Sequence, residues 1–263
     1  SGSVPRRWKH AFITPTPKGK SVTGPADTRP ISILPAMMKV VEKLVQSQVT
    51  EYFESHHLFS PRQHGYRKHL STETALSVIS DKVLAAMDRG EISLLVLLDQ
   101  SKCFDVVPHQ LLLDKLSLYG IHTEWFSNYL SDHVQQVVTR GADGTTLTSD
   151  VKPNSLGVYQ GGSLSCLLYA IFSNDLCLHA PDGVHVGQYA DDVTLLVSGK
   201  KKNLPQLIER MEAALDSLYQ WFCQHNMKVN ESKTKMIVLG TPAMLRDAPE
   251  VTLTFNGSQL LES

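Results

Sequence analysis

The chain has 263 residues, of which 42% are hydrophobic and 19% charged, proportions that are typical of a globular protein. This length allows one large domain or two joined subdomains, and no apolar run approaches the roughly 18 residues of a membrane-spanning helix. The four cysteines form no C-x-x-C pair and the eleven histidines show no ligand spacing with them. The pattern therefore indicates reduced core cysteines and argues against a disulfide scaffold or a zinc site.

The net charge is −1, but the charges are unevenly distributed. Residues 1–70 carry 11 Lys and Arg against 4 Asp and Glu, whereas the rest of the chain carries 14 against 22. A basic region that can contact phosphates beside an acidic region that can hold cations suits chemistry on nucleotides. Random asymmetry is the alternative explanation, and the counts alone do not separate the two.

Hydrophobic periodicity and turn residues predict the elements in chain order. The first 35 residues are predicted to be irregular apart from an extended piece at 11–15. A helix follows at 37–57, with an apolar side formed by Val40, Val41, Leu44, Val45 and Val49. Ser71 is predicted to cap a helix at 74–87. The later elements are a strand 92–98, helices 108–119 and 123–131, a hairpin 134–139 with 146–151, a helix 163–178, strands 183–188 and 193–197, a helix 204–224, a strand 235–239, and a strand 251–255 that begins a hairpin left incomplete by the chain.

The alternation of strands and helices after residue 90 predicts an α+β fold, in which an antiparallel sheet carries helices on one face. The strand 92–98 is almost continuously apolar, which indicates that both of its faces are covered.

Two adjacent aspartates, Asp191 and Asp192, lie between two short apolar strands, and Asp99 ends a third. Carboxylates about 4 Å apart repel by roughly 4 kcal/mol at an effective dielectric near 20, so a cluster of three favours bound cations. Mg²⁺ prefers oxygen ligands, and a pair of ions serves in-line phosphoryl displacement, which needs positioning and charge compensation rather than a protein nucleophile. A bare Asp-Asp pair is more often a solvated turn, but the flanking strands and Asp99 favour a metal site. Since neighbouring side chains on a strand point to opposite faces, we expect Asp191 to face Asp99 and Asp192 to support them.

Six blocks stand out along the chain. They are Arg29-Pro30-Ile31-Ser32-Ile33-Leu34, Gln63-His64-Gly65-Tyr66-Arg67 with Ser71-Thr72, Leu98-Asp99-Gln100-Ser101-Lys102-Cys103-Phe104-Asp105 with Val107-Pro108-His109, Gly157-Val158-Tyr159-Gln160-Gly161-Gly162-Ser163-Leu164, Tyr189-Ala190-Asp191-Asp192, and Asn230 with Lys233-Thr234. In their order and spacing these blocks closely resemble those of the reverse transcriptases of non-LTR (LINE-type) retrotransposons. The likeness runs from Trp8 to the C-terminus.

The resemblance implies a right-hand polymerase fold with fingers at 1–90, a palm at 91–263 that carries a fingers insertion near 120–160, and no thumb in this chain. It implies an RNA-directed DNA polymerase that extends a DNA primer on an RNA template with dNTPs, using two Mg²⁺ ions for which Mn²⁺ could substitute. Such a protein is expected in the nucleus and cytoplasm, within a ribonucleoprotein of a mobile element and away from membranes. Its oligomeric state is not predicted.

The resemblance also assigns roles to residues of the acidic region. Asp99, Asp191 and Asp192 match the family's catalytic carboxylates, and these three together with Gln100 match its metal site. Lys233 matches a lysine that could protonate departing pyrophosphate, with a surface salt bridge as the alternative.

Five further residues match positions that bind substrate. Lys18 and Arg29 match fingers residues that hold the triphosphate, with a solvated loop as the alternative. Phe104 matches the ring that blocks a ribose 2′-hydroxyl, with core packing as the alternative. Gln160 and Gly161 match the loop that lies against the incoming nucleotide.

The chain departs from the family pattern in this loop. Tyr159 stands where Pro is usual, and the usual Gly-Ser after the glutamine is here Gly161-Gly162-Ser163. We expect these changes to alter the rigidity of the loop and its nucleotide or template preference without removing a catalytic group. Cys103 also replaces a more usual Ala, which is compatible with close packing.

Two other functions remain open at this point. A domesticated or truncated nucleic-acid-binding module would have lost polymerase activity, although the intact aspartates argue against such decay. Another palm enzyme, such as a primer-independent polymerase or a nucleotidyl cyclase, would not need the blocks that precede Asp99. Without a thumb, we expect the chain to bind duplex weakly, in a salt-sensitive way, and to extend poorly.

Overall fold

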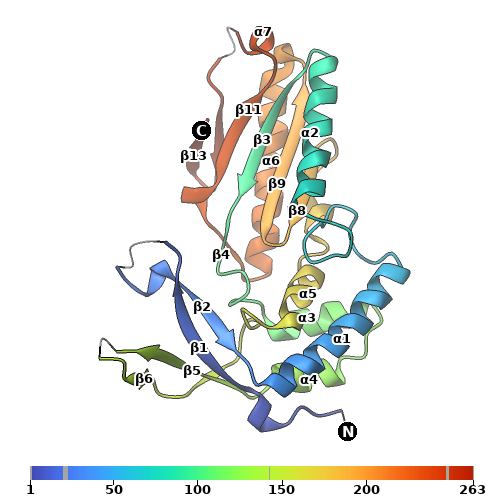
Figure 1. Ribbon diagram of the computed structural model, residues 1–263. Helices are drawn as coiled ribbons and strands as arrows, with labels where there is room; N and C mark the ends of the chain where they lie inside the picture. Colours follow the sequence, from blue (N-terminus) through green and yellow to red (C-terminus); the bar gives the residue numbers. More distant parts are fainter. Residues whose placement is uncertain (1, 20–22, 142, 247–248, 263) are drawn as a thin grey trace. The chain divides into compact units, whose positions relative to one another are not determined.

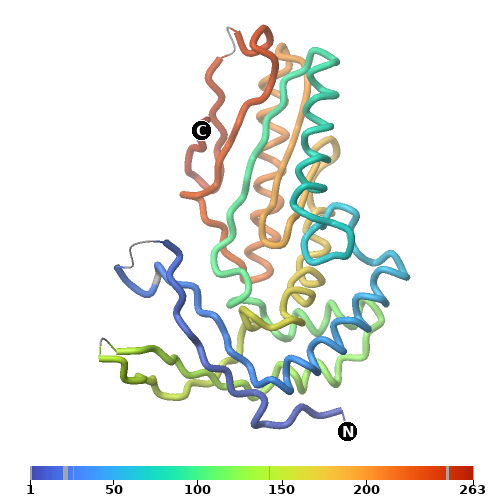
Figure 2. Tube along the Cα trace, viewed as in Figure 1, coloured from blue at the N-terminus to red at the C-terminus, as the bar shows by residue number. Residues whose placement is uncertain are grey.

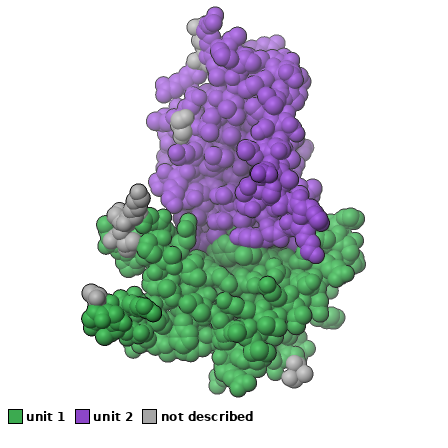
Figure 3. Space-filling view, in the orientation of Figure 1, with its two compact units in different colours: residues 1–58, 104–172 green, residues 59–103, 173–263 purple. Residues whose placement is uncertain are grey.

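The computed structural model describes residues 2–19, 23–141, 143–246 and 249–262. The chain forms two compact units (Figure 3): unit 1 is residues 1–58 and 104–172, and unit 2 is residues 59–103 and 173–263. Each unit is built from two separated stretches, as the colour change along the trace in Figure 2 makes clear. The domain boundary expected at residue 90 falls inside unit 2, and the assignment of fingers and palm stays a prediction.

Unit 1 contains a five-stranded sheet (Figure 1). In this sheet β1 (His10–Pro17) pairs antiparallel with β2 (Thr28–Ile33) and parallel with β5 (His133–Arg140). The partners of β5 on its antiparallel side are β6 (Thr146–Thr148) and β7 (Lys152–Asn154).

The first 35 residues contain more strand than predicted. The extended piece expected at 11–15 lies within β1, but β2 was predicted to be irregular. Its Pro30 lies opposite Pro15 of β1, and β2 is an edge strand. Proline lacks the N–H of a strand residue but is tolerated at a sheet edge, which is why this strand has so little sequence signal.

The helices of unit 1 surround an apolar helix, α5 (Ser163–Phe172), most of which is fully buried. Both α1 (Ala36–Ser55) and α3 (His109–Leu118) pack against α5, and α4 (Glu124–Leu130) packs against α3. The prediction that α5 continues to residue 178 is wrong. A separate 3-10 turn, Leu176–His179, follows it, because the polar pair Ser173-Asn174 interrupts the helix and the Asn174 side chain accepts the Ser60 N–H at 2.7 Å.

The helix α1 is present where its periodicity predicted it, but its buried side matches the prediction only in part. Val40 and Leu44 are 51% and 60% exposed. The buried positions are Met38, Glu42, Val49 and Phe53. The predicted apolar side is confirmed at Val49 and wrong at Val40 and Leu44, and the buried side also carries a carboxylate, Glu42.

Unit 2 contains a four-stranded antiparallel sheet in the order β11 (Lys235–Leu239), β3 (Ile92–Leu98), β9 (Asp192–Gly199), β8 (His185–Tyr189). Figure 1 shows this sheet between α2 (Thr72–Asp88) and α6 (Leu204–Gln224). The bounds of β3, β11 and α6 are those predicted, and Ser71 caps α2 by accepting the Thr74 N–H, as expected.

The two helices cover opposite faces of the sheet. Val83 of α2 packs against Leu95 and Leu196 on one face. The residues that alternate with these along β3 and β9 are buried on the other face, where α6 packs: Leu94, Val96, Leu195 and Val197. The antiparallel sheet of the predicted α+β fold is therefore present, but the expectation that its helices share one face is wrong.

Shorter elements complete the described chain. They are β4 (Gln100–Ser101) paired with β10 (Lys228–Val229), the hairpin of β12 (Thr252–Phe255) with β13 (Ser258–Leu261), the short helix α7 (Pro242–Leu245), and 3-10 turns at Arg6–Trp8, Pro25–Asp27, Lys201–Asn203 and Glu231–Lys233. The last hairpin is complete, contrary to prediction. Its turn, Asn256-Gly257, has positive φ at both residues and is a strong hairpin signal. Within the described ranges, no helix combines the length and apolar character needed to cross a bilayer.

A histidine on β8 makes the stability of the protein depend on pH. The pKa of His185 is lowered from 6.5 to about 4, first by burial and then by the positive charges of Lys82, Arg62 and His64. Between these two values the unfolded chain binds a proton that the folded chain does not, so the free energy of unfolding falls as pH falls. Because His185 is only partly buried, we expect a loss of about 1–2 kcal/mol after screening by solvent. Urea unfolding at about pH 7 and about pH 4 checks this: His185→Gln should lose less stability than the parent, and equal losses would contradict the assignment.

Candidate active site

The turn between β8 and β9 carries the two adjacent aspartates. Tyr189 pairs with Asp192, so Ala190 and Asp191 form a two-residue turn. Ala190 has φ 58°, the left-handed backbone that tight hairpins require at the first central position. The turn residue Asp191 thereby projects from the end of the sheet, whereas Asp192 is the first residue of β9.

The register of the sheet brings the third aspartate to the same place. Leu98 at the end of β3 pairs with Val193 of β9, so Asp99, the next residue, comes opposite Asp192. The pKa of Asp192 is raised, first by burial and then by the charges of Asp191 and Asp99. Asp191 and Asp99 therefore both act electrostatically on Asp192. The register sets Asp99 opposite Asp192, whereas the alternation of side chains predicted that Asp191 would face it.

Two neighbours hold Asp191 in this arrangement. The Gln100 side-chain Nε2 donates to the Asp191 carbonyl at 2.6 Å. The Cys103 thiol lies 3.3 Å from the Asp191 Oδ2 and donates to it. The Gln100 side chain is thus already used, and a metal role for this residue would fall to its backbone carbonyl. The sequence predicts only close packing for Cys103, and the thiol contact with Asp191 goes beyond that prediction.

A lysine lies beside Asp99. The Lys233 Nζ is 3.6 Å from the Asp99 Oδ2, and their side chains are 67% and 35% exposed. The Asn230 N–H donates to the Asp99 carbonyl at 2.7 Å, which ties this block to the end of β3. An ion pair this exposed contributes only about 0–1 kcal/mol to stability. The salt-bridge alternative for Lys233 is therefore seen, and a role of this residue toward a phosphate stays a prediction.

The side chains of this site offer aspartate oxygens, the ligand type that a hard divalent cation prefers. Among the residues that the structure describes, no three His, Cys, Asp or Glu side chains meet as a cluster that could hold a metal. Mg²⁺, however, is usually held by one or two carboxylates and completed by water and substrate phosphates. Aspartates at a strand end fit that kind of substrate-completed site. Burial and then the charges of Asp191 and Asp99 raise the pKa of Asp192, and a bound cation would offset those charges.

The other predicted substrate residues lie in unit 1. Phe104 stacks on Tyr169, with ring centroids 4.9 Å apart. Gln160 donates from Nε2 to the Asp105 Oδ1 at 3.0 Å, and its carbonyl accepts the Ser32 N–H at 2.7 Å. These contacts fix the backbone of the predicted nucleotide loop against β2.

Glycine is required at one position of this loop. Gly161 has φ 115°, and a Cβ there would lie 3.0 Å from the Ser32 carbonyl oxygen. Lys18 and Arg29 are exposed at the end of the β1–β2 hairpin, where the Lys18 N–H donates to the Asp27 carbonyl at 2.8 Å. The structure thus places the basic residues Lys18 and Arg29 on one hairpin. Gln160 and Gly161 of the predicted nucleotide loop lie next to β2.

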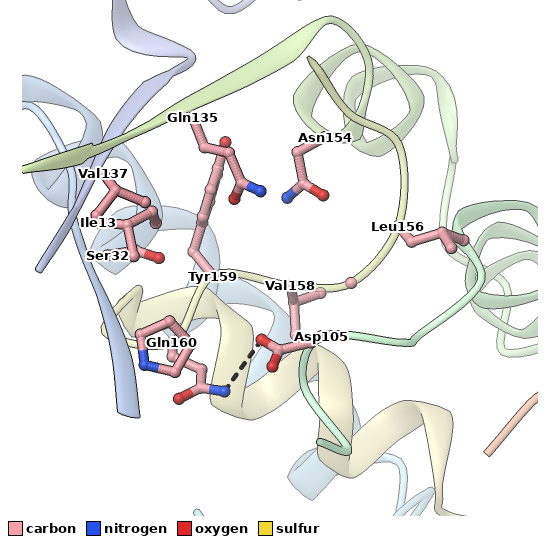
Figure 4. A pocket seen from close by; sticks show the side chains of 12 residues that line it. Ile13, Ser32, Asp105, Gln135, Val137, Asn154, Leu156, Val158, Tyr159 and Gln160 are labelled. Carbon is pink, nitrogen blue, oxygen red and sulfur yellow. Dashed lines mark hydrogen bonds between the residues drawn. The ribbon is translucent and has the colours of Figure 1, made fainter. Parts of the chain in front are cut away.

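A cavity of about 300 Å³ lies between this loop and the sheet of unit 1 (Figure 4). Its walls include the apolar Ile13, Val137 and Leu156 and the amide side chains of Gln135 and Asn154. Figure 4 also shows the Gln160–Asp105 hydrogen bond at its edge. Apolar walls with a few amides suit a flat group with polar edges, such as a nucleobase.

The comparison with protein families decides which family these features belong to. Residues 16–258 match the family model described as reverse transcriptase (RNA-dependent DNA polymerase). The chain belongs to the reverse transcriptase family. The alternative of a palm enzyme from another family is thereby excluded.

The curated relatives of this reverse transcriptase come from mobile elements. The chain is 29% identical over 245 residues to the RNA-directed DNA polymerase from mobile element jockey of Drosophila melanogaster, covering 88% of this chain and 26% of the relative. It is 30% identical over 243 residues to the probable RNA-directed DNA polymerase from transposon BS of the same species, with coverage of 88% and 26%. It is 28% identical over 214 residues to the Pol polyprotein of retrotransposable element R2 of Popillia japonica, with coverage of 74% and 28%. The resemblance to non-LTR retrotransposons is confirmed, and the chain spans about a quarter of the length of these relatives.

Solved structures support the fold. The apo telomerase of Candida tropicalis truncated from its C-terminal domain matches with a TM-score of 0.58 at 12% identity, covering 98% of this chain and 54% of that one. At this identity the match shows the fold alone, and it confirms the predicted right-hand polymerase fold.

Sequence reasoning missed a buried carboxylate that anchors the predicted nucleotide loop where it enters α5. Glu42 of α1 is fully buried, and burial raises its pKa. Its oxygens accept the Ser163 N–H at 2.8 Å and the Tyr129 O–H at 2.7 Å. An acceptor at the first N–H of α5 caps the helix that begins where the loop ends. A single Glu in an amphipathic helix gives no sequence signal for such a role.

The departure at Tyr159 is explained by the same core. Its ring is buried and its hydroxyl is 2.7 Å from the His133 Nδ1. His133 in turn contacts the Tyr129 carbonyl, so loop, β5 and α4 are linked. A tyrosine that is bonded through its side chain can hold the loop where a proline would hold it through its ring.

Proposed function

We propose that this domain is an RNA-directed DNA polymerase that adds deoxynucleotides to the 3′-hydroxyl of a DNA primer on an RNA template. The observation that supports it most is the register that sets Asp99 opposite Asp192 beside the turn carrying Asp191, in a chain of the reverse transcriptase family. Phosphoryl transfer needs charge compensation and positioning, and aspartates at the end of a sheet can share cations with the phosphates of a bound substrate.

Members of this family use divalent metal ions, and we propose two Mg²⁺ ions here, with Mn²⁺ as a possible substitute. Asp99 and Asp191 would hold them, with Asp192 and the Gln100 carbonyl as supporting ligands. When bound, the ions supply charge neutralisation for the triphosphate and a lower pKa for the attacking hydroxyl. The chain itself orients these carboxylates through the sheet register and through the bonds of Gln100 and Cys103 to Asp191.

The proposed substrate contacts follow from side-chain chemistry. Lys18 and Arg29 would bind the triphosphate, since a guanidinium can contact phosphate oxygens in pairs. Gln160 and Gly161 would lie against the incoming nucleotide. Lys233, already beside Asp99, would donate a proton to the departing pyrophosphate.

Primer extension tests the proposed function. On an RNA template with dNTPs we expect Mg²⁺-dependent product that EDTA abolishes, faint product with rNTPs, and salt-sensitive binding to duplex. If the chain binds duplex but adds no nucleotide under any metal condition, the function is the alternative of a binding module without polymerase activity. Nothing in the described part of the chain favours that alternative over catalysis. A setting in a nuclear and cytoplasmic ribonucleoprotein also belongs to this proposal.

Replacing Phe104 by Ala is expected to relax the choice of sugar. The ring is held by stacking on Tyr169, so it forms a rigid wall that a 2′-hydroxyl would meet. We expect the ratio of dNTP to rNTP incorporation to fall by about 10- to 100-fold. Single-nucleotide incorporation with matched dNTP and rNTP measures the ratio. Phe104→Tyr keeps the ring and should keep the preference, and an unchanged ratio in Phe104→Ala would assign the ring to packing alone.

A further inference from the structure

A segment outside the aspartate blocks lies along the edge strand of unit 2. The Gln188 N–H of β8 donates to the Arg62 carbonyl at 2.8 Å, and the His64 N–H donates to the Gln188 carbonyl at 2.8 Å. Gln63 and Gln188 thus form a parallel bridge. Since β8 is an edge strand of the sheet, these bonds fix residues 62–64 next to the strand that leads into the aspartate turn.

The side chain of Gln63 reaches the turn itself. It is fully buried, and its Oε1 accepts the Gly65 N–H at 2.8 Å and the Ala190 N–H at 3.2 Å. Two donors converge on this atom, so it must be the amide oxygen. Its Nε2 has no hydrogen-bond partner among the described residues. Without the Gln63 oxygen, the Ala190 N–H would be buried without an acceptor, which costs about 1–3 kcal/mol. The bond from Ala190 to Gln63 therefore stabilises this turn conformation.

Gly65 contacts the same turn sterically. A Cβ at this position would lie 2.1 Å from the Ala190 nitrogen and 2.7 Å from its Cα. Both are backbone atoms, so any side chain at 65 would have to displace the turn. The need for glycine is one of space, because the φ of Gly65 is outside the left-handed region.

The acceptor is also uncharged. Asp191 follows Ala190 directly, and Asp192 already experiences the charges of Asp191 and Asp99. A glutamate at 63 would accept the same two bonds but would add a fourth carboxylate beside the cluster. Glutamine therefore supplies the hydrogen bond without further repulsion.

We propose that Gln63 and Gly65 are positioning residues that form a seat for the Ala190-Asp191 turn and so set the direction of the Asp191 carboxylate. The kinetic part of this inference rests on the proposed polymerase function. The seat itself can be tested without activity.

Amide hydrogen exchange at Ala190 tests the seat directly in the full chain. Replacing Gln63 by Met keeps the shape of the side chain and removes the acceptor. We expect the Ala190 amide to exchange about tenfold faster in Gln63→Met, as it would after losing roughly 1.4 kcal/mol of protection. Gly187→Ala is the matched control on β8, because a Cβ there makes only ordinary contacts at 3.8 Å. Unchanged exchange in Gln63→Met would overturn the seat.

Single-turnover incorporation of one dNTP tests the consequence for the reaction. We expect the rate constant to fall about 100-fold in Gly65→Ala and about 10-fold in Gln63→Met, with dNTP affinity within about threefold of the parent, since a displacement near 1 Å can cost that much. The burst amplitude should match the parent, whereas a merely structural role would lower the amplitude and leave the rate constant unchanged. Gln63→Glu keeps an acceptor oxygen and should restore slow exchange at Ala190. If the parent adds no nucleotide, the proposed function fails, and the exchange experiment still decides the seat.

Discussion

Asp191→Asn is expected to lower the rate of dNTP addition by about 10³-fold or more, because loss of one carboxylate at a two-metal site removes about 4 kcal/mol of charge stabilisation in the transition state. Asparagine keeps the size of the side chain and removes the charge. The Gln100 side chain donates to the backbone carbonyl of residue 191, and this hydrogen bond does not depend on the charge of the side chain at 191. The turn should therefore persist. Single-turnover primer extension on an RNA template, with Mg²⁺ varied, measures the loss.

The matched comparisons come from the same unit. Asp182→Asn changes an exposed aspartate just before β8 and should extend like the parent. Asp99→Asn should lose as much as Asp191→Asn. Asp192→Asn separates two arrangements: a smaller loss fits a supporting ligand, and an equal loss fits the register that sets Asp192 opposite Asp99. Parent-like extension by Asp191→Asn would refute the assignment of the site.

Glu42→Ala is expected to cause the largest loss of stability of any change discussed, about 3–5 kcal/mol. The change leaves the Ser163 N–H and the Tyr129 hydroxyl without their acceptor inside the core and opens a cavity. Thermal unfolding followed by circular dichroism should show a Tm about 10 °C lower.

Two variants control for this effect. Glu42→Gln keeps one acceptor oxygen for Ser163, and its amide can donate to the Tyr129 oxygen, so the loss should be about 1 kcal/mol. Glu51→Ala removes an exposed glutamate from the same helix and should change little. A Glu42→Ala protein as stable as Glu51→Ala would show that the buried carboxylate does not cap α5.

Secondary structure was predictable where a local pattern was strong. The apolar run of β3 and the long amphipathic α6 gave the observed bounds. The errors have physical causes: β2 contains Pro30 and survives only as an edge strand, and α1 buries Glu42 while exposing Val40 and Leu44. In both cases tertiary partners replaced the interactions that the local pattern implied.

The candidate site was predictable in its residues and less so in its geometry. The strand-end Asp99 and the Asp191-Asp192 pair could be found from motif and spacing. The role of Gln63 could not, because its bond to Ala190 joins residues 127 positions apart. Residue type gives no indication of a contact that distant, and Gly65 was recognisable only as part of a motif without a stated purpose.

The interleaving of the two units has a consequence for how the protein is made. Residues 1–58 are synthesised before residues 104–172, which complete unit 1. Residues 59–103 are likewise synthesised before the segment from residue 173 onward that completes unit 2. The strand β1 therefore remains without its partner β5 until residues 133–140 have been translated. No single cut in the polypeptide yields both units intact, so studying either one alone would require rejoining its two stretches with a new linker.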